Sequence, residues 1–235
     1  ANDDSGATTK AQFNIAKTYM KMGDYRNAIQ VFLKARWKYC SDHSSSVIEY
    51  QIGNCLYLLN EYQDASNVLV NYLVNEEEGE FGENAIFLLG DCFYKLNNYL
   101  GAFQIFRKAI ERYSKSNKVP GGIYCMGKSL RAMNMPESAI KILREGLQAF
   151  PVDDTAGKMA FEIGMCYFDK GEYCLAYNAF DSFVKQYPQD ELVVEAMIVM
   201  SDALLDDKKY VEATNSYFGL LKISNSDDIR RYAFN

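Results

Sequence analysis

The chain has 235 residues, of which 49% are hydrophobic and 24% charged, and its formal net charge is −6. This composition is that of a folded protein rather than a disordered one, and the negative charge argues against a nucleic-acid partner. No apolar run reaches the roughly 18 residues that a membrane-spanning helix needs, so we expect no direct membrane insertion.

Residues 1–8 are expected to form an N-terminal tail. After them, residues 22–32 read "MGDYRNAIQVF", and residues 170–180 read "KGEYCLAYNAF", the same order of Gly, acid, Tyr, Ala and Phe four steps of 37 residues later. The alanine of this phrase returns at every step of 37, at Ala28, Ala65, Ala102, Ala139, Ala176 and Ala213.

Three further columns keep the same step. Three residues before the alanine stand Tyr25, Tyr62, Tyr99, Pro136, Tyr173 and Tyr210. Four residues after it stand Phe32, Leu69, Phe106, Leu143, Phe180 and Tyr217. Twelve residues before it, in what we call the small-residue column, stand Ala16, Gly53, Gly90, Gly127, Gly164 and Ser201. Four columns in register across six copies indicate a repeat protein.

Each copy is expected to be a pair of antiparallel helices. In the third copy, "NAIFLLGDCFYKLNNYLGAFQIFRKAIERY" places apolar residues at steps of three and four on both sides of "NN". One pair cannot bury its apolar face alone, so neighbouring pairs are expected to stack into an all-α solenoid. We expect one domain over residues 9–226, with units 9–45, 46–82, 83–119, 120–156, 157–193 and 194–226. Residues 227–235 are expected to begin a capping or seventh-unit helix, either as a short cap ending at Asn235 or within a longer protein.

Residue patterns that could carry catalysis are weak. Gly122–Ser129, "GIYCMGKS", matches the phosphate-binding P-loop letter for letter, but no strand precedes it and Gly127 belongs to the small-residue column, so we interpret the match as coincidence. The single histidine, His43, pairs only with Cys40 in a lone C-x-x-H, which is half of a metal site at most. We therefore expect no enzyme activity, no catalytic residue, no metal and no cofactor.

Three of the six cysteines, Cys55, Cys92 and Cys166, stand two residues after the small-residue column, where the helix should face the core. Equivalent positions in adjacent units should be separated by a helix-packing distance, which exceeds the span of a disulfide. We therefore expect buried free thiols, and unpaired thiols favour a reducing compartment such as the cytoplasm.

The order of small residue, turn, Tyr, Ala and aromatic resembles the tetratricopeptide repeat, over about residues 9–226. The resemblance implies a right-handed superhelical solenoid that binds a protein or peptide segment in its concave groove. The 37-residue unit and junctions such as "FVKQYPQDELVVEAM" are similar to the repeats of bacterial periplasmic proteins. Examples are the coordinator associated with the Tol–Pal system and the assembly lipoproteins of the outer-membrane β-barrel machinery. The resemblance therefore favours the periplasm, whereas the cysteines favour the cytoplasm.

Residues of the first helix of each unit are the expected partner-binding residues, because the resemblance places these helices along the groove. Aromatic side chains dominate two of its columns, and Tyr suits peptide recognition. The candidates are Phe13, Lys17, Met20, Tyr50, Asn54, Tyr57, Phe87, Asp91, Tyr94, Tyr124, Lys128, Arg131, Phe161, Phe168 and Leu205. The rings of the column that contains Phe13 could equally pack against a second helix.

Charges on the same helices change sign along the chain. The first unit carries Lys10, Lys17 and Lys21, whereas the last two carry Asp169, Glu195, Asp202 and Asp206. This contrast fits an oriented partner segment or a head-to-tail contact between copies. Three functions remain open. The first is a non-catalytic interaction scaffold, with a bacterial cell-envelope adaptor as its specific form. The second is a structural component that self-associates or packs into a larger machine, and the third is the substrate-holding arm of an enzyme whose catalytic domain lies outside this chain.

Overall fold

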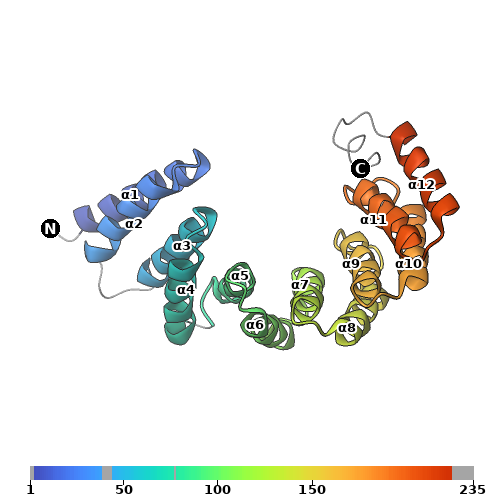
Figure 1. Ribbon diagram of the computed structural model, residues 1–235. Coiled ribbons are helices and arrows are strands. Elements are labelled where there is room, and N and C mark those ends of the chain that lie inside the picture. Colours follow the sequence, from blue (N-terminus) through green and yellow to red (C-terminus); the bar gives the residue numbers. More distant parts are fainter. Residues whose placement is uncertain (1–2, 39–43, 77, 224–235) are drawn as a thin grey trace. The chain divides into compact units, whose positions relative to one another are not determined.

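The computed structural model describes residues 3–38, 44–76 and 78–223, and the regular structure in these ranges is entirely helical (Figure 1). The helices are α1 Asp3–Lys21, α2 Tyr25–Lys38, α3 Ser44–Leu58, α4 Tyr62–Glu76, α5 Gly82–Lys95, α6 Tyr99–Arg112, α7 Val119–Ala132, α8 Pro136–Ala149, α9 Ala156–Asp169, α10 Tyr173–Gln186, α11 Val193–Asp206 and α12 Tyr210–Ile223. The prediction of an all-α chain of helix–turn–helix repeats is confirmed.

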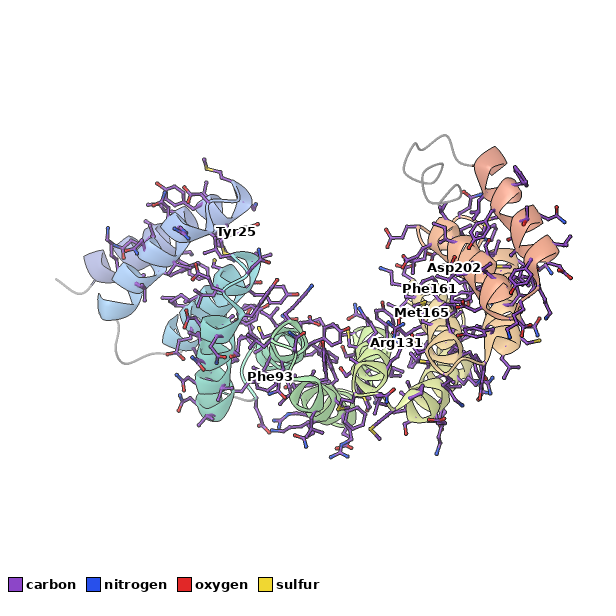
Figure 2. All side chains as sticks on the ribbon, in the orientation of Figure 1. Tyr25, Phe93, Arg131, Phe161, Met165 and Asp202 are labelled. Atoms are coloured by element: carbon purple, nitrogen blue, oxygen red, sulfur yellow. The ribbon has the colours of Figure 1, made fainter. Side chains whose placement is uncertain are left out.

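The second helix of every pair begins at the tyrosine or proline column, as Tyr25 does at the start of α2 (Figure 2). The first helix corrects one prediction, because α1 begins at Asp3 and residues 3–8 are helical rather than a tail. The sequence begins this helix with two acidic residues, and helix N-termini favour negative charge. The predicted capping or seventh helix at residues 227–235 lies outside the described residues.

The turn between the two helices of each pair has one residue in the left-handed region. These residues are Gly23 (φ 76°), Asn60 (63°), Asn97 (58°), Asn134 (59°), Gly171 (73°) and Lys208 (60°). Glycine adopts this conformation without strain, and asparagine adopts it more readily than most residues. All six stand seven residues after the small-residue column, so the repeat specifies the backbone of its turn as well as its core.

The small-residue column is explained by the close approach of the two helices in a pair. A Cβ added to Gly53, Gly90, Gly127 or Gly164 would lie 3.0, 2.7, 2.4 or 2.6 Å from a side-chain atom of Leu69, Phe106, Leu143 or Phe180, respectively. Each of these partners is the large residue four positions after the repeat alanine. Two columns found in the sequence therefore pack directly onto each other within each pair.

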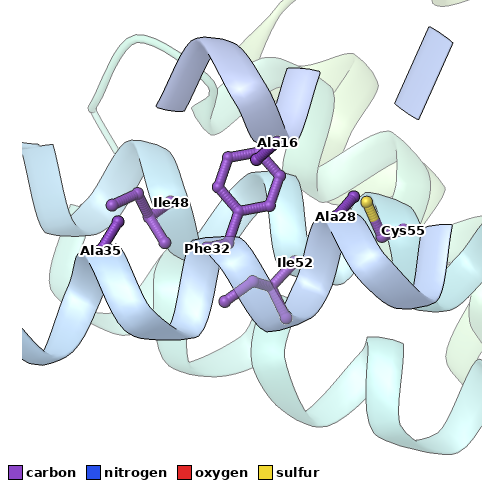
Figure 3. Packing of buried hydrophobic residues seen from close by; sticks show 7 residues of the cluster. All are labelled: Ala16, Ala28, Phe32, Ala35, Ile48, Ile52 and Cys55. Atoms are coloured by element: carbon purple, nitrogen blue, oxygen red, sulfur yellow. The ribbon is translucent and has the colours of Figure 1, made fainter. Parts of the chain in front are cut away.

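The chain divides into two compact units at residues 116 and 117, and each is described separately. In the first unit, Phe32 packs with Ala16 of its own pair and with Ile48 and Ile52 of the next first helix (Figure 3). In the second unit, Phe180 and Phe183 pack with Ala196 and Met200 in the same way. Within each unit, the second helix of these pairs thus joins its own first helix to the following one. The assignment of one domain to residues 9–226 stays a prediction.

Candidate partner-binding face

The candidate residues stand at positions −3, +1 and +4 from the small-residue column of the first helices. These spacings place side chains on one side of a helix. Arg131 of α7, Met165 of α9 and Asp202 of α11 accordingly lie on the same side of the second unit (Figure 2). We call the surface that carries these positions the first-helix face of each unit: α1, α3 and α5 form it in the first unit, and α7, α9 and α11 form it in the second.

The −3 column turns toward the core of its own helix pair. The rings of Phe13 and Phe32 lie 5.6 Å apart, those of Phe87 and Phe106 lie 6.4 Å apart, and those of Phe161 and Phe180 lie 5.3 Å apart. Phe87 is 7% exposed and Phe161 is 6% exposed. Packing against the second helix is thus the main role of these two predicted site residues.

The tyrosines of the same column are less deeply buried. Tyr50 and Tyr124 are both half-buried. The ring of Tyr50 stacks on Phe81 with centroids 4.6 Å apart and planes 9° apart. Tyr50 therefore combines packing within the first unit with some accessible surface.

The +4 column contains a repeated pair of rings. Tyr57 packs edge-on against Tyr62, Tyr94 against Tyr99, and Phe168 against Tyr173, with centroid distances of 5.4, 5.4 and 5.5 Å. All three first-helix rings are half-buried, so each keeps part of its surface accessible while its neighbour holds it in place. At the same column, Met20 is half-buried and Leu205 is exposed.

The +1 column carries polar and charged groups beside these rings. Lys17 Nζ lies 4.9 Å from the ring centroid of Phe13, and Lys128 Nζ lies 5.3 Å from that of Tyr124. Such placement over an aromatic ring is weakly attractive. Asn54 and Asp91 occupy this column in the second and third helix pairs and are half-buried. The column therefore differs in charge from one pair to the next.

Arg131 replaces the aromatic residue of the +4 column and contacts two carboxylates of α9. Its Nε lies 3.1 Å from Oε1 of Glu162 and 3.5 Å from Oδ2 of Asp169. Glu162 is only 4% exposed. Glu162 is not among the predicted site residues, although the sequence contains a signal for it: its column holds only uncharged residues in the other five pairs. These are Asn14, Gln51, Leu88, Cys125 and Val199.

Glu162 lies among charges from three helices. Burial raises the pKa of its carboxyl above the ordinary value, and the positive charges of Arg131 and Lys128 offset part of that rise. Asp169 and Glu195 raise the pKa further. Among the described residues, neither Glu162 Oε1 nor Arg131 Nη1 makes a hydrogen bond. Burying charged groups without a full set of hydrogen bonds is unfavourable, so this cluster lowers the free energy of unfolding of the second unit.

The segment that matches the P-loop pattern lies within α7. Gly127 in that segment is buried against Leu143, where an added Cβ would meet a methyl carbon. The glycine is thus explained by helix packing, as the repeat pattern indicated. His43 and Cys40, the residues of the lone C-x-x-H, lie outside the described residues.

Cys55, Cys92 and Cys166 are buried free thiols, as predicted. Burial raises the pKa of Cys55 to about 11, and burial chiefly raises those of Cys92 and Cys166 to about 12. A thiol with so high a pKa is almost fully protonated near neutral pH and is a poor nucleophile. These side chains therefore belong to the core.

Models of tetratricopeptide repeats match residues 9–35, and also residues 84–116 and 160–190. No curated protein matches the sequence. None of the described helices is long and apolar enough to cross a membrane.

Several solved structures have a similar fold. The C-terminal part of a TPR repeat-containing protein from Cytophaga hutchinsonii has a TM-score of 0.71 at 20% identity, covering 90% of this chain and 78% of that one. PilF of Pseudomonas aeruginosa has a TM-score of 0.66 at 14% identity, covering 98% of each chain. YrrB, a TPR protein with an unusual peptide-binding site, has a TM-score of 0.59 at 19% identity, covering 86% and 96%. Three segments of the chain thus match models of tetratricopeptide repeats, and the fold is similar to that of solved proteins with these repeats.

Proposed function

We propose that this chain is an interaction scaffold that holds a segment of a partner protein against its first-helix face. Tetratricopeptide arrays are typically non-catalytic scaffolds for proteins or peptides, and the repeats support that general role. The observation that carries the more specific proposal is the +4 column, where three edge-on ring pairs recur at the repeat spacing.

Rings held in this way are suited to binding. A half-buried ring packed against a tyrosine has little side-chain entropy left to lose when a partner covers it. Aromatic residues are also enriched among those that dominate binding energy. The neighbouring +1 column supplies charges and amides that differ between pairs, which can orient the partner.

The test is affinity capture from native lysate with the wild-type chain and with the Tyr57→Ser, Tyr94→Ser, Phe168→Ser variant. A matched control, Val70→Ser, Leu100→Ser, Leu175→Ser, changes three exposed residues of second helices in the same two units. We expect the first variant to lose a partner that the control keeps, and direct titration of the purified partner to give at least a tenfold weaker affinity, about 1.4 kcal/mol.

Circular dichroism and thermal melts establish that each protein is folded before capture. Equal capture by all three proteins would contradict the proposal and direct attention to the second helices.

A second function, self-association, is favoured by one observation. The columns that carry Lys17 and Lys21 in the first pair carry Asp202 and Asp206 in the sixth, so copies could meet with opposite charges. Sedimentation velocity over a concentration series would show association that weakens with added salt. A monomer at all concentrations would exclude this function.

The cell-envelope adaptor role belongs to the proposal as well. The similarity of the 37-residue unit to periplasmic repeats supports it. Fractionation of cells that express the full-length protein would test this location directly, since an envelope adaptor must be recovered outside the cytoplasmic fraction.

A further inference from the structure

We propose that an acidic amphipathic helix of a partner protein packs onto one open side of α1, at the end of the first unit. We call this side the α1 end face and define it by Ala11, Ile15, Thr18 and Met22. Steps of four, three and four residues place these side chains on a single stripe of the helix. The stripe stands at positions −5, −1, +2 and +6 from the small-residue column, on a different side of α1 from the first-helix face. The proposal therefore goes beyond the proposed function and does not depend on it.

The columns of the α1 end face are buried in the other five first helices. Ile15 is 49% exposed, whereas the other members of its column are at most 9% exposed, namely Ile52, Leu89, Met126, Ile163 and Met200. Thr18 is also exposed, whereas the other members of its column are at most 1% exposed, namely Cys55, Cys92, Ser129, Cys166 and Ala203. Ala11 is exposed in a column that is buried in every other pair. The end face thus keeps the apolar pattern of a packed surface, although no helix that the structure describes covers it.

The neighbouring pairs show what kind of element covers these columns. Positions −5, −1 and +2 of α3 are Ile48, Ile52 and Cys55, and they pack with Ala28, Phe32 and Ala35 of α2 (Figure 3). The same positions of α5 are Ala85, Leu89 and Cys92, and they pack with Ala65, Leu69 and Tyr72 of α4. In both cases the covering helix presents an alanine, a large apolar residue four positions later and a third residue seven positions later. A helix with this pattern is therefore expected to fit the α1 end face.

The one polar residue of the stripe is compatible with burial. The hydroxyl of Thr18 donates to the carbonyl oxygen of Asn14 at 2.9 Å. Ser129, in the same column of α7, donates in the same way to the carbonyl oxygen of Cys125 at 2.8 Å and is fully buried. A covering helix would thus leave the Thr18 hydroxyl paired while it removes the apolar surface of the stripe from water, which favours binding.

Charge favours an acidic partner helix over a second copy of α1. Residues 10–22 contain no acidic residue and three lysines, which are Lys10, Lys17 and Lys21. Steps of seven and four place these lysines along one edge of the end face. Two copies of α1 packed together would bring like charges close, which opposes association, whereas acidic residues beside the stripe of a partner helix would favour it.

The probe for this face is a fluorescent, terminally blocked peptide with the sequence of residues 61–76, which we call the α4 peptide. Within the chain this segment covers the equivalent columns of α5, and it contains three acidic residues and no Lys or Arg. A hydrocarbon staple between the exposed positions Asn67 and Asn71 stabilises it, because a helix of this length is only marginally stable alone. We expect anisotropy titration with the full chain to show saturable binding. The same peptide with Leu69→Ser and Tyr72→Ser should bind at least about tenfold more weakly.

Variants of the chain test which surface holds the α4 peptide. Ile15→Ser with Met22→Ser should weaken binding at least about tenfold. The matched control, Leu33→Ser with Val74→Ser, changes two residues of second helices that are 42% and 78% exposed, against 49% and 72% for Ile15 and Met22. The control should bind the peptide as the wild type does, and circular dichroism should show an unchanged fold in both variants. Unchanged binding by the first variant, or an equal loss in the control, would overturn the proposal.

A cross-link tests the placement of the helix. Tyr72 and Ala85 belong to one packed cluster, and Ala85 stands in the column of Ala11. The α4 peptide with Tyr72→Cys should therefore form a disulfide with Ala11→Cys, in a chain whose cysteines outside the +2 column are replaced by serine. Lys34→Cys, at an exposed position of α2, is the control and should cross-link far less. Equal cross-linking at both positions would overturn the placement on the α1 end face.

Two further outcomes separate this proposal from the other functions. Sedimentation velocity of the chain alone should show no association that Ile15→Ser with Met22→Ser removes, and such an association would overturn the choice of a partner helix in favour of a second copy. The Tyr57→Ser, Tyr94→Ser, Phe168→Ser variant should bind the α4 peptide as the wild type does. A loss in that variant would place the peptide on the first-helix face and overturn the proposal.

Discussion

Gly127 shows how one residue controls the distance between two helices. An added Cβ would lie 2.4 Å from Cδ2 of Leu143, so the Leu143 side chain or one of the two helices would have to shift. Gly127→Ala is therefore expected to lower the free energy of unfolding by about 1–3 kcal/mol, the usual cost of overpacking a core. Urea denaturation followed by circular dichroism measures this change.

Gly121 of the same helix is the matched control, because an added Cβ there meets no atom within 4 Å. Gly121→Ala should leave stability unchanged or raise it by up to about 1 kcal/mol, the difference in helix propensity. A similar loss in both variants would mean that helix backbone effects, rather than contact with Leu143, determine the result.

Single residues differ in how readily the sequence predicts them. The small-residue column could be predicted because spacing alone identifies it, and Gly53, Gly90, Gly127 and Gly164 all lie where a larger residue would clash. Phe87 and Phe161 were candidates for the partner-binding face, with packing against a second helix as the open alternative, and both are buried. The spacing predicts the side of the helix on which an aromatic ring lies. It does not predict how the helix is oriented, which decides whether the ring faces the second helix or the solvent.

At the scale of elements, α7, α9 and α11 bring together charges whose contacts have consequences for pH dependence. Burial holds the pKa of Glu162 above its ordinary value of 4.5. A carboxyl with a raised folded-state pKa adds stability below pH 4.5, and that contribution is lost as pH rises through the folded-state pKa. Relative to the wild type, Glu162→Gln should therefore gain melting temperature as pH rises from about 4 toward neutrality.

Glu137 gives a control of opposite sign. Hydrogen bonding to Lys170 lowers the pKa of Glu137 below its ordinary value, so its contribution is present above pH 4.5 and is lost on acidification. Glu137→Gln should lose melting temperature relative to the wild type over the same pH range. Parallel pH profiles for the two variants would contradict the assignment of burial as the cause at Glu162.

The helices could be predicted from the sequence, whereas the contacts between charged residues of different helices could not. Helix and turn positions follow the period, so the second helices begin at the predicted column. Arg131 and Glu162 are 31 residues apart and meet only because two first helices pack side by side. Local helix propensity does not predict this contact. The sequence does show, however, that both residues differ in type from the other members of their columns.

At the scale of the whole molecule, the buried cysteines can show how far a local unfolding event in one repeat extends along the chain. Cys55 and Cys92 lie in the first unit and Cys166 in the second. Their raised pKa values and burial mean that a thiol reagent reaches them only after the local structure opens. In stacked repeats, stability is approximately a sum of repeat and nearest-neighbour contributions.

Gly127→Ala should therefore accelerate labelling of Cys166, about tenfold for each 1.4 kcal/mol lost locally, and accelerate labelling of Cys55 less. The measurement is timed labelling followed by peptide mass spectrometry, with Cys40, Cys125 and Cys174 replaced by serine. Equal acceleration at both sites would show that the chain opens as one cooperative body.

The left-handed residue at every turn has a consequence for how such a chain can grow. Each helix pair ends its first helix through its own backbone, at Gly23, Asn60, Asn97, Asn134, Gly171 or Lys208. A duplicated gene segment of one 37-residue period includes the left-handed residue that ends the first helix. It also includes the residue of the small-residue column and the large residue that packs against it. Ancestral copies could thus be inserted whole, and later diverge in charge, without redesign of either neighbour.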